Sequence, residues 1–150
     1  MAALLYGSFA QGEGDAYSDI EFALFFAGEA LPGIDQRAWV GQIAPVLRYF
    51  VNEFGNGTAI FVHEADLIRG EFHFDSVSDI PTVATWRETD SFPSLEATLI
   101  LDRTGAGELT RHLQALIGPS PPRDAPDRIQ FLCDSLINWL LFGVNVLDRG

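Results

Sequence analysis

Apolar and polar residues alternate over several short stretches of the chain, and apolar residues recur at helical spacing over longer ones. The short stretches predict β-strands over residues 2–6, 19–26, 58–63, 69–75 and 97–101. The longer ones predict helices over residues 35–54, 105–117 and 126–147. Residues 76–93 have no clear period and are expected to be mostly loop. This order predicts an α+β fold, in which a mixed β-sheet with helices on one side precedes the start of a helical region.

The first predicted helix has recognisable signals along its length. Asp35 is a typical N-cap residue. One apolar stripe would contain Trp39, Ile43, Leu47, Phe50 and Phe54. Pro45 is expected to kink or divide this helix, and Gly55-Asn56-Gly57 to end it.

The stretch from Gly7 to Phe26 combines a glycine-rich loop with two nearby acids. Gly7 and Ser8 follow the first predicted strand, and such a turn suits the phosphates of a nucleotide or is simply a tight turn. Asp19 and Glu21 are one residue apart at the start of the next strand and therefore share a face. Two like charges so placed repel each other, which favours a bound cation such as Mg²⁺ over an ordinary solvent-facing edge.

A second alternation lies in residues 69–75. The polar residues of this segment share one face of the predicted strand, and they are Arg69, Glu71, His73 and Asp75. In the simplest interpretation, Glu71 is a surface carboxylate that pairs with Arg69 on this face. His73 is a candidate for substrate binding, although a histidine on a half-buried strand is more often structural.

Composition narrows the functional classes. The chain has 150 residues, 47% of them hydrophobic, and a formal net charge of −12, so we expect a folded domain that binds no nucleic acid. All nine basic residues are arginine, which excludes a Walker-type phosphate lysine. The lone Cys133 is expected to be buried and fits a cytoplasmic protein without disulfides. The longest apolar stretch, residues 136–146, is too short to span a membrane.

Three segments together resemble one enzyme family. YGSFAQGEGDAYSDIEF, LIRGEFHF and WLLFGVNVLDRG are similar to segments of the lincosamide nucleotidyltransferases, which belong to the DNA polymerase β-type nucleotidyltransferase superfamily. The resemblance covers essentially the whole chain. It implies a nucleotidyltransferase-like sheet and an antibiotic-resistance activity. In that activity a nucleoside monophosphate passes from an NTP such as ATP to a hydroxyl of lincomycin or clindamycin, with release of pyrophosphate.

The same resemblance implies roles for individual residues. Asp19 and Glu21 would be ligands of Mg²⁺, with two ions expected, and Gly7 and Ser8 would hold the triphosphate of the NTP. Glu71 would be the general base that takes the proton from the drug hydroxyl.

The resemblance also implies a domain organisation. Residues 1–118 would be the catalytic domain, and residues 119–150 a linker and the first helix of a C-terminal helical domain. Because relatives extend further at both ends, we expect the chain to be part of a longer protein or a short form that pairs with a partner, such as a second copy in a homodimer. Two alternatives stay open. In the first, the nucleotide is transferred to an aminoglycoside or to a protein hydroxyl. In the second, the chain is a non-catalytic interaction module.

Overall fold

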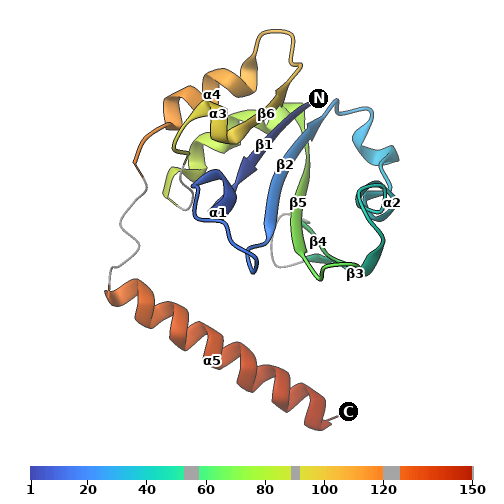
Figure 1. The fold of residues 1–150 in the computed structure, drawn as a ribbon, viewed down its shortest axis with the longest axis vertical. Helices are drawn as coiled ribbons and strands as arrows, with labels where there is room; N and C mark the ends of the chain where they lie inside the picture. The colour runs from blue at the N-terminus through green and yellow to red at the C-terminus, as the bar shows by residue number, and fades with distance from the viewer. Residues whose placement is uncertain (53–57, 89–91, 120–125, 150) are drawn as a thin grey trace. The chain divides into compact units, whose positions relative to one another are not determined.

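The computed structural model describes residues 1–52, 58–88, 92–119 and 126–149 (Figure 1). The chain divides into two compact units, Met1–Ser120 and Pro121–Gly150, and each is described by itself. The first unit contains the sheet, and the second contains a long helix.

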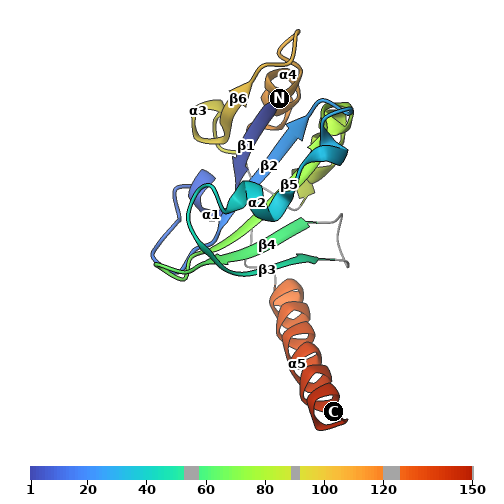
Figure 2. The ribbon, with the colours of Figure 1, turned by 90° about the vertical axis from the view of Figure 1, so that its right-hand side faces the viewer.

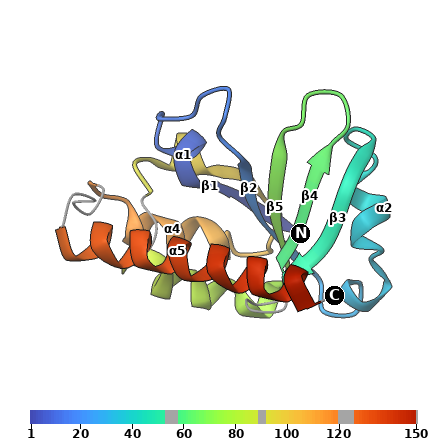
Figure 3. The ribbon, with the colours of Figure 1, turned by 90° about the horizontal axis from the view of Figure 1, so that it is seen from below.

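Within the described residues, the first unit contains a six-stranded sheet in the order β3-β4-β5-β2-β1-β6 (Figure 2). Figure 3 shows the part of this order from β3 to β1. The strands are β1 (Ala2–Tyr6), β2 (Ile20–Phe26), β3 (Val46–Asn52), β4 (Thr58–His63), β5 (Arg69–Ser76) and β6 (Leu99–Asp102). β2 and β5 run parallel, whereas the other neighbouring strands run antiparallel. The α+β class and the mixed sheet predicted from the sequence are therefore confirmed.

Helices cover both faces of the sheet because both faces are apolar. In β1, for example, Leu4 belongs to one apolar layer and Ala3 to the other. The first layer is completed by η2 (Val77–Glu88), α3 (Leu95–Thr98) and α4 (Glu108–Leu116). The second layer is completed by η1 (Leu31–Gly33) and α2 (Gln36–Val40), and α2 lies in front of the sheet in Figure 2. The expectation of helices on one side was therefore wrong.

The helix predicted over residues 35–54 forms only at its beginning. Asp35 caps α2 as expected, because its carboxylate accepts a hydrogen bond from the backbone N–H of Ala38 at 2.9 Å. The helix ends at Val40, and after Pro45 the chain forms β3. A helix through Pro45 would lose one hydrogen bond and suffer a ring clash. The prediction of one long helix was therefore wrong.

Residues 46–52 form the strand β3 because of a tertiary interaction, which apolar spacing along the sequence does not reveal. The backbone of β3 pairs antiparallel with β4, so the N–H and C=O groups on that side of this edge strand find partners outside a helix. Leu47 and Phe50 are consequently 44% and 56% exposed, not aligned on a buried stripe. Phe54 and the stop signal Gly55-Asn56-Gly57 lie outside the described residues.

Residues 76–93, expected to be mostly loop, contain the helical segment η2. Ile80 and Val83 of η2 are fully buried in the first apolar layer. Pro81 lies inside the segment. A 3₁₀ helix has about three residues per turn, so its buried positions do not show the 3.6-residue period by which an α-helix is recognised in a sequence.

The last elements of the first unit follow the predictions more closely. The predicted strand over residues 97–101 is preceded by α3 and begins as β6 at Leu99, and the helix predicted over 105–117 forms as α4. Asp102 joins β6 to α4, because its carboxylate accepts hydrogen bonds from Thr104 and from the backbone and side chain of Thr110. Burial raises the pKa of Asp102, but these hydrogen bonds outweigh burial and lower the pKa to about 2.

The second unit contains α5 (Pro126–Arg149), as the apolar pattern predicted. Several large apolar side chains of this helix are exposed, among them Phe131, Leu136, Leu140 and Val144. Cys133, expected to be buried, is exposed. In the part of the chain that the structure describes, no helix is both long and apolar enough to cross a membrane.

Candidate active site

The strand register brings together the residues that the sequence singled out. Tyr6, the last residue of β1, pairs with Glu21 of β2, and Glu21 pairs with Glu71 of β5. Gly7 directly follows Tyr6. The parallel pairing of β2 with β5 therefore places Glu21 and Glu71 at the same level of neighbouring strands, beside the turn after β1. Figure 1 shows β1, β2 and β5 next to one another, with α1 after β1.

Gly7 lies directly against the carboxylate of Glu21. Its φ of +70° is in the left-handed region, which residues with a side chain rarely adopt. A Cβ at this position would lie 1.6 Å from Oε2 of Glu21. Only glycine fits here without displacing the carboxylate, and the backbone of the turn thus approaches the acid closely. Ser8 follows within α1 (Gly7–Ala10) and is half-buried.

Arg69 lies between two of the acids. One of its guanidinium nitrogens donates a hydrogen bond to Oδ2 of Asp19, and the other donates to Oε2 of Glu71 at 2.6 Å. Burial lowers the pKa of Arg69, but the hydrogen bond and charge of Glu71 outweigh this effect and raise the pKa, with smaller contributions from Asp19 and Glu21. The alternative ion pair between Glu71 and Arg69 is therefore present, although the Glu71 side chain is only 26% exposed.

The donor chemistry of the site suits Mg²⁺, but Arg69 occupies part of it. Asp19, Glu21 and Glu71 present carboxylate oxygens, the ligands that Mg²⁺ prefers. Among the residues that the structure describes, no group of three or more His, Cys, Asp or Glu side chains is arranged to hold a metal ion. The guanidinium of Arg69 instead pairs with both Asp19 and Glu71. Metal binding at Asp19 therefore requires Arg69 to change its partners.

His73 continues the polar face of β5 beyond Glu71. Its Nε2 lies 4.0 Å from Oε1 of Glu71, and its Nδ1 lies 3.4 Å from the hydroxyl oxygen of Thr58. The ring also contacts Tyr6 and Trp86, with centroid separations of 5.8 and 5.9 Å. His73 thus has structural neighbours on several sides and still borders the acid.

Two cavities border these residues, one next to His73 and the other next to Arg69. One, of about 320 Å³, is lined by His73, Asp75, Asp79, Thr82, Thr85 and Trp86. The other, of about 360 Å³, is lined by Ala16, Tyr17, Ser18, Asp66, Leu67, Ile68 and Arg69. Sequence reasoning missed the contribution of η2 to the first cavity, because residues 76–93 were expected to be mostly loop. The aromatic residue Trp86 was the sequence signal that could have indicated this contribution.

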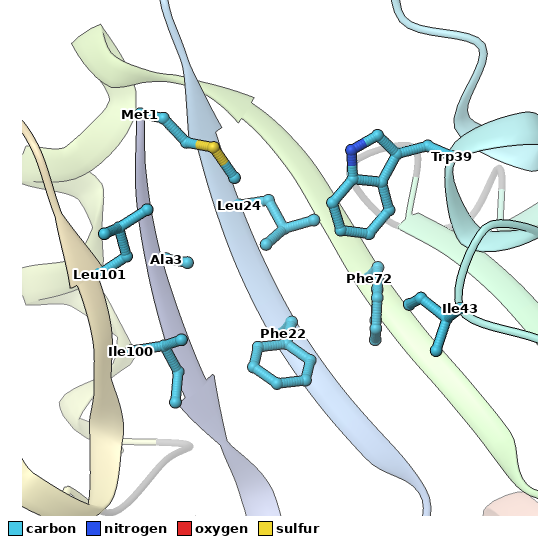
Figure 4. A pocket seen from close by; sticks show the side chains of 9 residues that line it. All are labelled: Met1, Ala3, Phe22, Leu24, Trp39, Ile43, Phe72, Ile100 and Leu101. Atoms are coloured by element: carbon cyan, nitrogen blue, oxygen red, sulfur yellow. The ribbon is translucent and has the colours of Figure 1, made fainter.

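An apolar pocket of about 260 Å³ lies on the opposite face of the sheet. In Figure 4, Phe22 and Leu24 of β2 line its floor, and they alternate with Glu21 along the strand. Trp39 and Ile43 border one side and Ile100 the other. This pocket is therefore separated by the sheet from the acids.

A scan against protein-family models and a search among curated proteins found no match for this chain. The similarity to lincosamide nucleotidyltransferases stays a prediction from the three sequence segments. The roles of Gly7, Ser8, Asp19, Glu21 and Glu71 stay predictions as well.

Proposed function

We propose that this chain transfers a nucleoside monophosphate from an NTP to a hydroxyl group of a lincosamide antibiotic, with release of pyrophosphate. The observation that supports the proposal best is the register of three strands. It places Glu21 next to Glu71 and places the Gly7 turn against Glu21. A glycine turn and acids that are far apart along the chain thereby share one site, as the motif resemblance requires.

In the proposed reaction the turn would bind the nucleotide and two of the acids would bind its Mg²⁺. Gly7 and Ser8 would hold the triphosphate beside the Glu21 carboxylate, which lies directly against Gly7. Asp19 and Glu21 would hold Mg²⁺, which supplies positive charge to the triphosphate and to the departing pyrophosphate when it is bound.

Glu71 would accept the proton of the acceptor hydroxyl. Its Oε2 is engaged by Arg69, whereas its Oε1 faces His73 at 4.0 Å. We therefore assign Oε1 as the proton acceptor and the His73 side of the face as the direction from which the acceptor approaches. Arg69 holds the Glu71 side chain in this orientation through the 2.6 Å hydrogen bond.

The experiment is a transfer assay followed by mass spectrometry. The protein is incubated with lincomycin, Mg²⁺ and each NTP in turn, and an adduct heavier by one nucleoside monophosphate is expected. Glu71→Gln keeps the shape of the side chain and removes the base, so adduct formation should fall by at least about a hundredfold. Glu96→Gln, an exposed residue of α3, is the matched control and should retain activity.

Two results would contradict the proposal. Absence of an adduct with every NTP would exclude lincomycin as the acceptor, and parallel reactions with an aminoglycoside and with protein hydroxyls would then test the other acceptors. Absence of an adduct with every acceptor, together with no Mg²⁺-dependent binding of NTP in calorimetry, would exclude nucleotidyl transfer by this chain.

A further inference from the structure

The cavity between β5 and η2 has a lining that is rich in hydrogen-bond acceptors. His73 and Asp75 come from β5, and Asp79, Thr82, Thr85 and Trp86 come from η2. His73 and Asp75 lie on the same strand face as Glu71, because side chains two residues apart point to the same side. The cavity is thus an extension of the candidate active site along the strand.

The two threonines of the cavity have already used their hydroxyl hydrogens. Thr82 donates its hydroxyl to the backbone oxygen of Asp79 at 2.6 Å, and Thr85 donates its hydroxyl to the backbone oxygen of Thr82 at 2.7 Å. A hydroxyl carries one hydrogen and two lone pairs, so both oxygens now offer only acceptor positions. The carboxylates of Asp75 and Asp79 are acceptors as well. The two threonines and the two aspartates of this lining are therefore complemented by a ligand that donates hydrogen bonds.

The charges and the aromatic ring of the cavity favour a donor that is also a cation. Asp75 and Asp79 add negative charge, and Trp86 adds an aromatic ring, whose face attracts cations. Burial raises the pKa of Asp75, His73 opposes this effect, and the nearby charge of Asp79 adds to it. A bound cation would offset the unfavourable burial of the Asp75 carboxylate. An anionic phosphate group, in contrast, would be repelled from this cavity.

We propose that the cavity between β5 and η2 binds an ammonium group of the acceptor, while the acceptor hydroxyl lies at Oε1 of Glu71. This inference rests on the proposed function and specifies its acceptor as a hydroxylated amine. His73 and Asp75 are two and four residues from Glu71, a span of about 7–13 Å at about 3.3 Å per residue. The amine and the reacting hydroxyl must therefore be separated by a distance typical of a glycoside rather than of a single amino alcohol.

The test compares two rings that differ in charge. Streptamine carries two ammonium groups and several hydroxyls on a six-membered ring, and scyllo-inositol is the same ring with hydroxyls in place of both amines. Each is titrated into nitrogen-labelled protein without nucleotide, and the indole N–H signal of Trp86 is followed by NMR, assigned with Trp86→Phe. Streptamine should shift this signal in a saturable manner, and scyllo-inositol should not.

Variants locate the binding site. Combined Asp75→Asn and Asp79→Asn should weaken streptamine binding by at least about tenfold, while Glu96→Gln should not change it. An equal response to both rings, no response of Trp86 to streptamine, or unchanged binding in the double variant would each overturn the proposal. If the double variant does not fold, the comparison of the two rings on the unaltered protein still decides.

This test can fail independently of the proposed function. Streptamine binding at Trp86 without nucleotide transfer to any acceptor would support the ammonium site and contradict the enzymatic function. Transfer to lincomycin with an unchanged KM in the Asp75→Asn variant would support the function and contradict the site.

Discussion

Replacing Arg69 by methionine tests whether this residue neutralises the acids of the candidate active site. The substitution keeps an unbranched apolar stem and removes the guanidinium that donates hydrogen bonds to Asp19 and Glu71. It leaves both carboxylates, and the Glu21 carboxylate that is level with Glu71, without this counter-charge. The expected results are a less stable protein and a site that binds divalent cations more tightly.

The magnitude follows from the exposure of the partners. Ion pairs between exposed groups contribute about 0.2–1 kcal/mol each, and hydrogen bonds to charged groups contribute about 1.5–3 kcal/mol. The Arg69 side chain is 43% exposed, so solvent screens both interactions and the lower values apply. We therefore expect Arg69→Met to lower the free energy of unfolding by about 1–2 kcal/mol at low salt. This loss corresponds to a fall of about 2–8 °C in the unfolding midpoint.

The assay is thermal and urea denaturation at low salt, with and without Mg²⁺. Without Mg²⁺ the variant should be less stable than the unaltered protein, and added Mg²⁺ should stabilise the variant more, because the carboxylates no longer have an internal cation. Arg111→Met, which removes an exposed arginine on α4, is the control for the loss of one positive charge. The reasoning is refuted if the variant is at least as stable as the unaltered protein and its response to Mg²⁺ equals that of the control.

Further predictions follow from Gly7, Asp102 and Ile80. Gly7→Ala should destabilise the protein by about 1–3 kcal/mol through backbone strain alone and should abolish nucleotide transfer by displacing Glu21. Gly12→Ala is the matched control, because Gly12 also has a positive φ, of +73°, but an added Cβ there would meet no atom within 4 Å. This variant should therefore lose a similar amount of stability and retain activity. The pKa of Asp102 in the folded protein is lowered from 3.8 to about 2, so its contribution to stability is present above about pH 4 and is lost as the pH falls through about 2. Thr110→Val should reduce this contribution. The free energy of unfolding, measured by urea denaturation near pH 6 and near pH 3, should therefore fall less on acidification in the variant than in the unaltered protein. An equal fall in both proteins would contradict the assignment to Asp102. Ile80→Ala should lower the free energy of unfolding by about 2–5 kcal/mol, because Ile80 is fully buried, whereas Ile100→Ala at a 55% exposed position should have a much smaller effect in the same urea titration.

The strands of the candidate site were predictable because their signals are local. Alternation of apolar and polar residues placed Glu71 and His73 on one face of β5 and Phe72 on the other, and the burial of these residues agrees. The cap at Asp35 was predictable for the same reason, since its hydrogen bond reaches only three residues along the chain.

The strand conformation of residues 46–52 was not predictable from the same local signals. Their apolar spacing fits a helix, but pairing with β4 made them a strand. The core position of Ile80 was hidden as well, because Pro81 and the absence of a period favoured a loop. In both cases the deciding interaction comes from another part of the chain.

By itself, the sequence identified candidate site residues and predicted which way they face along their own strands. The facing of Glu21 and Glu71 was predicted in this way, because side-chain direction in a strand depends only on the residue count. The tertiary structure alone decided that β2 lies parallel to β5, with Glu21 level with Glu71. It also placed Arg69 between Asp19 and Glu71, and it placed η2 beside β5 to form the polar cavity. These arrangements depend on register and packing between segments that are distant along the chain, which no local pattern specifies.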